Sequence, residues 1–216
     1  MEILRDKGEV RPCQLERDIV SAARAVDLKS PDWREQAKPL IELIPELAAM
    51  DFEFYNPACE GTVLEHSIRV AQALPDYLVL TGLLHDIGKI KCQVMEDNHN
   101  GPEFPRVMRF TGHEMAGADL AKPILERILV DWLGQPHWAK VSHMLKLNRF
   151  HDSRGRYFER DFDEMIGAFE TEAEIEDLFL LWQADDDAHT KEHVAKSGPV
   201  LESNIMETRE YYRNLF

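Results

Sequence analysis

The chain has 216 residues, of which 40 are acidic and 25 basic, giving a net charge of −15. This length suits one well-buried domain rather than two large ones, and the hydrophobic fraction of 44% argues against wholesale disorder. The acidic surface disfavours binding to long duplex nucleic acid. Three cysteines without a Cys-x-x-Cys pair argue against a disulfide framework, and no stretch is long and apolar enough for a membrane span, so we expect a cytoplasmic protein.

Hydrophobic periodicity predicts helices almost throughout and no alternating strand. The expected helices lie near 14–27, 34–49, 62–74, 76–87, 113–130, 137–148, 161–169, 174–190 and 203–214. Residues 91–112 and 149–160 are expected to be loops, and the second forms a basic island in an acidic chain. We therefore expect an all-α bundle, with residues 1–33 as an N-terminal flanking segment and 34–216 as the domain.

A His-Asp doublet follows the apolar stretch 78–84. Burying an imidazole beside a carboxylate is costly unless each group is paired or bound to a cation, so His85 and Asp86 are candidate metal ligands. Gly88, directly after them, predicts a helix end that tolerates a left-handed backbone. Lys89 places a cation one turn away, either as a phosphate clamp or as a charge that meets the helix dipole.

Further candidate ligands occur on other predicted helices, namely His66, His113, His143 and Asp185. A lone histidine in an apolar helix is more often a hydrogen-bonded core residue, but this combination favours metal binding. Imidazole and carboxylate donors without thiolate favour a divalent transition metal (Mn, Fe, Co, Ni or Zn) over Mg or Ca.

The order His66, His85-Asp86, further histidines and Asp185 resembles the HD superfamily of metal-dependent phosphohydrolases. The resemblance extends from about residue 44 to about residue 189. Within the superfamily, the stretches 60–66, 85–89 and 110–114 are most similar to the HD domain of bacterial CCA-adding tRNA nucleotidyltransferases. The segment 56–59 departs from that pattern because it lacks a histidine often present there.

The resemblance implies a metal site built by His66, His85, Asp86 and Asp185. Asp186 and Asp187 follow Asp185, but successive helical residues point about 100° apart, so only one of the three carboxylates can aim well at a metal.

Two more histidines have open roles. The resemblance implies that His113 and His143 either bind a second ion, with Asp86 bridging, or contact the phosphate directly. The alternative for His113 is a structural residue at a helix start. His151 is an alternative to His143 for the same role. We prefer His143, because apolar residues flank it at helical spacing.

Catalysis and substrate binding are assigned to overlapping sets of residues. Asp86, Lys89 and His113 are expected to be catalytic. The expected phosphate-binding residues are Lys89, His143, Arg154 and Arg156, the two arginines forming a bidentate grip or, alternatively, ordinary solvated surface.

The implied function is metal-dependent hydrolysis of a phosphoester on a nucleotide or RNA end, of the 2′,3′-cyclic phosphodiesterase, 2′-nucleotidase or phosphatase type. One alternative is a nucleotidase or dNTP phosphohydrolase of nucleotide-pool metabolism, and another is a non-catalytic nucleotide-sensing HD module. The expected partner is a small nucleotide or short RNA end, without long duplex nucleic acid or membrane. One or two ions per chain are expected, and the oligomeric state is left open, with a homodimer as one alternative.

Overall fold

The computed structural model describes residues 13–54, 58–59, 61–97, 106–131, 133–153 and 161–214. Its α-helices are α1 (Gln14–Ala25), α2 (Trp33–Gln36), α3 (Lys38–Leu43), α4 (Val63–Ala73), α5 (Val79–Leu84), α6 (His113–Ile128), α7 (Trp138–Phe150), α8 (Asp161–Ala168), α9 (Glu172–Asp187) and α10 (Lys191–Arg213). Short 3₁₀ helices are η1 (Pro45–Met50), η2 (Asp76–Leu78) and η3 (Ile87–Ile90). The predicted all-α bundle is confirmed.

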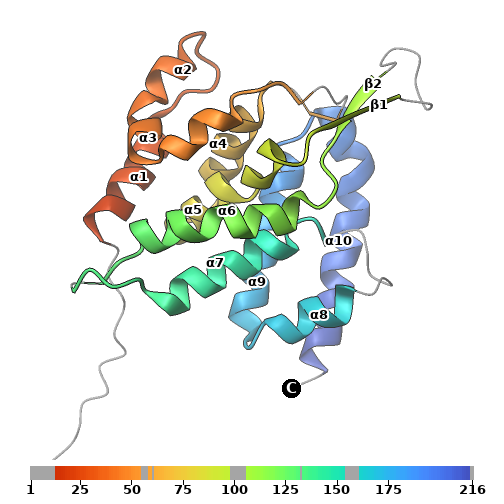
Figure 1. Ribbon diagram of the computed structural model, residues 1–216. Helices are drawn as coiled ribbons and strands as arrows, with labels where there is room; N and C mark the ends of the chain where they lie inside the picture. The colour runs from red at the N-terminus through yellow and green to blue at the C-terminus, as the bar shows by residue number, and fades with distance from the viewer. Residues whose placement is uncertain are drawn as a thin grey trace, which may run out of the picture.

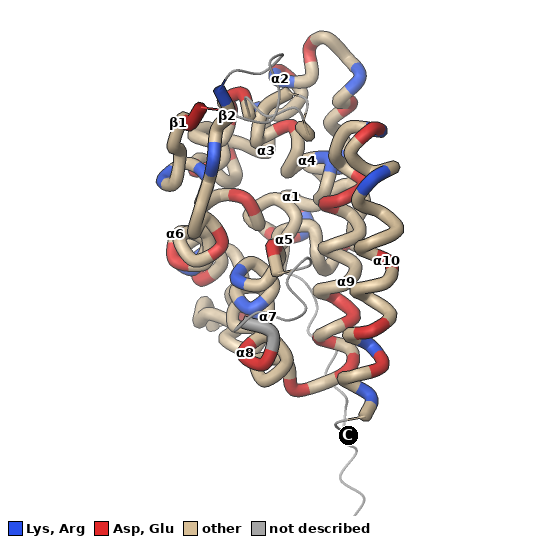
Figure 2. Tube along the Cα trace, turned by 90° about the vertical axis from the view of Figure 1, so that its right-hand side faces the viewer, with Lys and Arg blue, Asp and Glu red and all other residues tan. Residues whose placement is uncertain are grey.

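The helices pack as pairs around the His-Asp segment (Figure 1). Helix α4 packs against α5, α6 against α7, and α9 against both α4 and α10. Helices α9 and α10 run side by side at one edge of the molecule (Figure 2). One apolar core joins α4, α5 and α6 through buried residues such as Ile68, Leu83 and Leu125, and a second joins α7, α9 and α10 through Leu147, Trp182 and others. Leu84 and Ile87, on either side of the doublet, belong to the first core.

Helix α1 belongs to the first of these cores. Ile19 and Ala23 are fully buried there, in the same cluster as Leu83 of α5. The predicted flanking segment 1–33 thus contributes a helix that packs into the bundle.

Threonine side chains begin three of the helices that carry candidate ligands. Thr62 accepts a hydrogen bond from the Glu65 amide at 3.2 Å, which starts α4. Thr171 and Thr190 play the same role at the starts of α9 and α10. Such caps satisfy an otherwise unpaired amide of the first turn, so local sequence sets where these helices begin.

The expectation that residues 91–112 hold no regular element is wrong. Strands β1 (Val94–Asp97) and β2 (Arg106–Arg109) pair antiparallel, with Val94 opposite Arg109. Only Val107 in these two strands is buried, so the hairpin lacks the alternating apolar pattern from which a strand is predicted.

The role predicted for Gly88 is also wrong. Among the described glycines, positive φ occurs only at Gly61, Gly112 and Gly134, so Gly88 is not a left-handed helix stop. A Cβ atom on Gly88 would lie 1.9 Å from the His113 carbonyl oxygen. Glycine is required here because η3 approaches the first turn of α6 backbone to backbone.

Two predicted helices have different bounds in the structure. The segment expected near 34–49 is divided into α2, α3 and η1, and the last helix begins at Lys191 rather than near residue 203. Pro199 lies inside α10, where proline removes one backbone hydrogen bond of the helix. Buried Leu201 and Tyr212 pack in the core formed with α9, and this packing supports a continuous helix. None of the described helices has the length and hydropathy needed to cross a membrane.

Candidate metal centre

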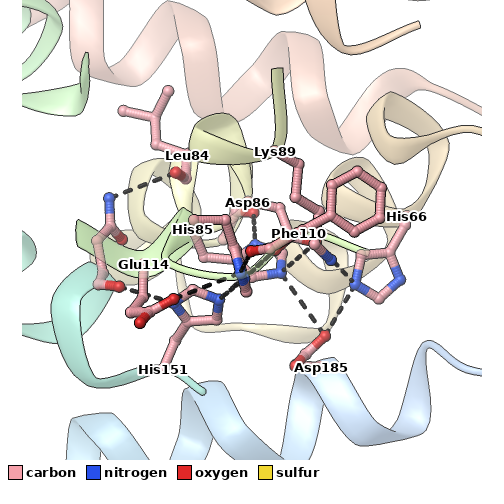
Figure 3. A network of polar contacts seen from close by, with 12 residues as sticks. His66, Leu84, His85, Asp86, Lys89, Phe110, Glu114, His151 and Asp185 are labelled. Atoms are coloured by element: carbon pink, nitrogen blue, oxygen red, sulfur yellow. Dashed lines mark hydrogen bonds and ion pairs between the residues drawn. The ribbon is translucent and has the colours of Figure 1, made fainter. Parts of the chain in front are cut away.

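Four predicted ligands converge between α4, α5 and α9 (Figure 3). His66 comes from α4, His85 caps the end of α5, Asp86 follows it, and Asp185 comes from α9. All four side chains are buried. We call these four residues the primary donor group.

The spacing of the donor atoms in this group suits a metal ion. His66 Nε2 lies 2.8 Å from Asp185 Oδ1 and 3.7 Å from Asp86 Oδ2, and His85 Nε2 lies 3.3 Å from Asp86 Oδ2 and 3.6 Å from Asp185 Oδ1. Ligands held about 2.0–2.2 Å from one ion stand roughly 3–3.5 Å apart, so the side chains present fit a metal with little movement.

Backbone carbonyls orient three imidazole rings of the centre. The Nδ1–H groups of His85, His113 and His151 donate to carbonyl oxygens three residues earlier, at 2.8, 2.9 and 2.6 Å respectively. Each ring is thereby left with Nε2 facing the centre, as in metal sites where a second partner holds the ring orientation. His85 Nε2 is buried and forms no hydrogen bond with any described residue. Its nearest acceptors are the Asp86 and Asp185 carboxylates at 3.3 and 3.6 Å, so this nitrogen faces the oxygens with which it would share an ion.

Asp86 also faces a second set of imidazoles through its other oxygen. Asp86 Oδ1 lies 3.3 Å from His113 Nε2 and 3.5 Å from His151 Nε2, and the two nitrogens are 3.0 Å apart. We call Asp86, His113 and His151 the second donor group. Its carboxylate is shared with the primary donor group, so Asp86 is placed as a bridge between the two.

Charge in the centre is balanced without a metal by protons on two side chains. Burial lowers the pKa of His66 to about 4 and keeps that ring neutral. Burial also acts to lower the pKa of His85, but the carboxylates of Asp86 and Asp185 outweigh it and raise the value to about 10. The His85 imidazolium therefore occupies the place that a divalent cation can take.

Lys89 is the second of these positive charges. Its ammonium lies 2.5 Å from Asp86 Oδ2 and sits over the rings of Phe54 and Phe110, with centroid distances of 4.7 and 5.3 Å. Burial opposes the charge on Lys89, but the Asp86 carboxylate raises its pKa. The pKa of Asp86 lies well below its usual range, since His85 and Lys89 overcome the effect of burial. The predicted cation beside the doublet is present.

A pocket of about 390 Å³ opens beside the centre. Its polar wall includes Lys89, Arg109, His113, His189 and His193, and its apolar wall includes Phe54 and Phe110. Sequence patterns did not identify Arg109, His189 or His193 as site residues. Arg109 belongs to the hairpin that was predicted to be a loop, and the two histidines flank the start of α10, which was predicted too far along the chain.

The preference for His143 over His151 requires correction. His143 Nε2 lies 2.8 Å from Asp177 Oδ2 and its Nδ1 lies 3.5 Å from Glu174, so it faces another part of α9. His151 instead joins Asp86 and His113. The apolar neighbours of His143 showed that this part of α7 is buried, but they did not show which partner its imidazole faces.

The two arginines predicted to grip phosphate, Arg154 and Arg156, lie outside the described residues. The described cation of the basic island, Arg149, pairs with Glu164, and neither residue lines the pocket. Lys146, which lies just before the island, pairs with Glu174.

The HD domain family matches residues 63–185, which is more than half of the chain. The matched segment begins with the first residue of α4 and ends at Asp185, so it spans the primary donor group. Comparison with curated proteins finds no match, and comparison with solved structures finds none either.

Proposed function

Since this chain belongs to the HD domain family, a superfamily of metal-dependent phosphohydrolases, we propose that it hydrolyses a phosphoester on a nucleotide or at an RNA end. The observation that carries the proposal is the primary donor group. Its two carboxylates and two imidazoles are buried at metal-ligand spacing, and His85 Nε2 has no other hydrogen-bond partner among the described residues.

The chain's own residues have separable tasks in this proposal. His66, His85, Asp86 and Asp185 would hold one divalent ion, and His113 and His151 would hold a second together with Asp86. When bound, such an ion supplies Lewis-acid activation of water and of a phosphoryl oxygen. Lys89 contributes a fixed positive charge at the pocket wall, where negative charge grows on a phosphoryl group during hydrolysis.

The pocket supports a small substrate. Its volume of about 390 Å³ lies within the range of roughly 300–1,000 Å³ common for small-molecule sites. Phe54 and Phe110 offer apolar faces to a base or ribose, while Lys89 and Arg109 offer cations to phosphate. A mononucleotide or a single RNA terminus matches this combination. A long duplex is a polyanion, and the net charge of −15 on the protein disfavours its binding.

Within this class we propose activity of the 2′,3′-cyclic phosphodiesterase or 2′-nucleotidase type, following the resemblance of the three sequence stretches described above. The test is a substrate panel assayed on protein stripped of metal and then reloaded with Mn²⁺, Co²⁺ or Ni²⁺. The panel contains 2′,3′-cyclic nucleotides, 2′-, 3′- and 5′-mononucleotides, deoxynucleoside triphosphates and an aryl phosphodiester.

We expect no hydrolysis after chelation, recovery with added metal, and preferred turnover of the cyclic or 2′-nucleotides. His85→Ala should lose the ion of the primary donor group and activity together. Preference for deoxynucleoside triphosphates would replace the proposed substrate class by a nucleotide-pool enzyme. Full turnover after exhaustive chelation would refute the metal-dependent reaction itself.

A further inference from the structure

A third group of potential ligands lies where α9 meets α10. Asp186, His189 and His193 each offer a ligand atom, and these atoms all lie within 4.8 Å of one another. We call these three residues the accessory group. It shares no residue with the primary or second donor group, although the His189 ring lies 5.2 Å from the His66 ring.

Asp186 is a buried carboxylate with one unpaired oxygen. The residue is 2% exposed, and its Oδ1 accepts a hydrogen bond from the Ser197 hydroxyl at 2.7 Å. Its Oδ2 is also buried but has no hydrogen-bond partner among the described residues. A buried anionic oxygen without a donor is costly, and a cation is the group that would compensate it.

The two histidines are arranged to supply nitrogen ligands. The Nδ1–H of His189 donates to the Asp185 carbonyl oxygen at 2.7 Å, which leaves Nε2 as its ligand atom. The His193 ring stacks on the His189 ring with centroids 4.7 Å apart, and His193 Nε2 lies 3.9 Å from Asp186 Oδ1. The last distance exceeds the roughly 3–3.5 Å between two ligands of one ion. The His193 side chain is 35% exposed, so a small rotation can close the difference.

We propose that the accessory group binds one divalent transition-metal ion such as Zn²⁺, Co²⁺ or Ni²⁺. Two imidazoles and one carboxylate suit these ions better than Mg²⁺ or Ca²⁺, which favour all-oxygen sites. His189 and His193 line the same pocket as Lys89, so the remaining coordination positions face the space assigned to substrate.

The ion would also join two helices. Asp186 lies on α9, His193 lies in the first turn of α10, and Ser197 orients the carboxylate from the next turn of α10. Metal binding should therefore hold the start of α10 against the end of α9. This inference stands apart from the proposed reaction, because it depends only on residues outside the two donor groups.

The test is the number of Ni²⁺ ions retained per chain, measured by elemental analysis after stripping, reloading and removal of free metal. His193→Ala and Asp186→Asn should each retain one ion fewer than the wild type. Lys196→Ala is the matched control, because Lys196 lies one turn further along α10 with its side chain 75% exposed. It should retain the wild-type number. If Asp186→Asn does not fold, His193→Ala alone decides the test. His193 is partly exposed, so its replacement should leave the fold intact.

Two outcomes separate this site from the proposed reaction. In a His85→Ala background, His193→Ala should still remove one ion, and the rise in thermal midpoint that Ni²⁺ causes should become smaller. An unchanged ion count in His193→Ala would overturn the accessory site while leaving the phosphohydrolase proposal intact. Loss of an ion in His193→Ala from a protein whose hydrolysis resists chelation would support the site and refute the reaction.

Discussion

His151 Nε2 lies 3.5 Å from Asp86 Oδ1, whereas His143, on the same helix and roughly two turns earlier, places its Nε2 2.8 Å from Asp177. Both histidines belong to the α7 segment and both face carboxylates, of which Asp86 is buried and Asp177 is partly exposed. Only His151 faces the carboxylate that also belongs to the primary donor group. This difference assigns the two histidines different expected effects on metal content.

The first prediction concerns these two residues. His151→Ala should lower the metal content of the fully loaded protein by one ion, because it removes a nitrogen of the second donor group. His143→Ala is the control and should leave the ion count unchanged. Elemental analysis of both variants at equal excess of Mn²⁺ measures the effect. Loss of an ion in His143→Ala with retention in His151→Ala would reverse the assignment.

The second prediction is that metal binding releases protons. With a pKa of about 10, His85 is an imidazolium at pH 7.5 in the metal-free protein, and it must become neutral to coordinate an ion. His66, with a pKa of about 4, is already neutral. Metal affinity should therefore rise with pH up to about 10, with release of about one proton per ion in the primary donor group at neutral pH. Calorimetric titrations in two buffers of different ionisation enthalpy measure this, and a heat of binding independent of buffer would contradict it.

The third prediction tests the close approach of η3 to α6. Gly88→Ala places a Cβ 1.9 Å from the His113 carbonyl oxygen and 2.5 Å from the Gly117 amide nitrogen. Both neighbours are backbone atoms, so relief requires movement of α6, and we expect a loss of about 3 kcal/mol in the free energy of unfolding. Gly167→Ala in α8 is the matched control, since a Cβ there meets no atom within 4 Å. It should raise stability by about 0.5–1 kcal/mol. Urea denaturation of the two variants gives both values, and equal effects would contradict the steric argument.

The fourth prediction concerns the positive charge beside Asp86. Lys89→Met should lower kcat/KM on the substrate hydrolysed best by on the order of 100-fold, because a fixed cation facing the phosphoryl group is lost. Lys91→Met removes an exposed lysine at the end of the same 3₁₀ helix and should have little effect. Steady-state kinetics of both variants at saturating metal provide the measurement. A wild-type kcat/KM in Lys89→Met would show that Lys89 compensates the charge of Asp86 and takes no part in catalysis.

The fifth prediction keeps the sequence-based role of Arg154 and Arg156. The double variant Arg154→Ala with Arg156→Ala should raise KM with little change in kcat if the pair holds substrate and transition state equally. Arg109→Ala, at the wall of the pocket, provides the comparison and should raise KM by the same reasoning. Unchanged kinetics in the double variant would leave the basic island as solvated surface.

Local sequence determined the fold class and the position of the buried His-Asp pair. The apolar stretch before His85 and Asp86 required a buried pair with a compensating cation, and helical periodicity elsewhere indicated an all-α bundle. Donor chemistry predicts a divalent transition metal at the pair. These features follow from residue type and short-range spacing, which do not depend on how distant segments pack.

Tertiary structure alone decided which partners the polar groups meet. Periodicity shows that one face of α7 is buried, but the choice between His143 and His151 depends on how α7 lies against α6 and α9. Gly88 is needed because η3 and α6 touch, and no local pattern encodes that contact. His193 reaches the pocket from the first turn of α10, which begins at Lys191 rather than near residue 203 and packs on α9 on the far side of Pro199. In each case the deciding free energy comes from contacts between segments far apart in the chain, which residue spacing does not record.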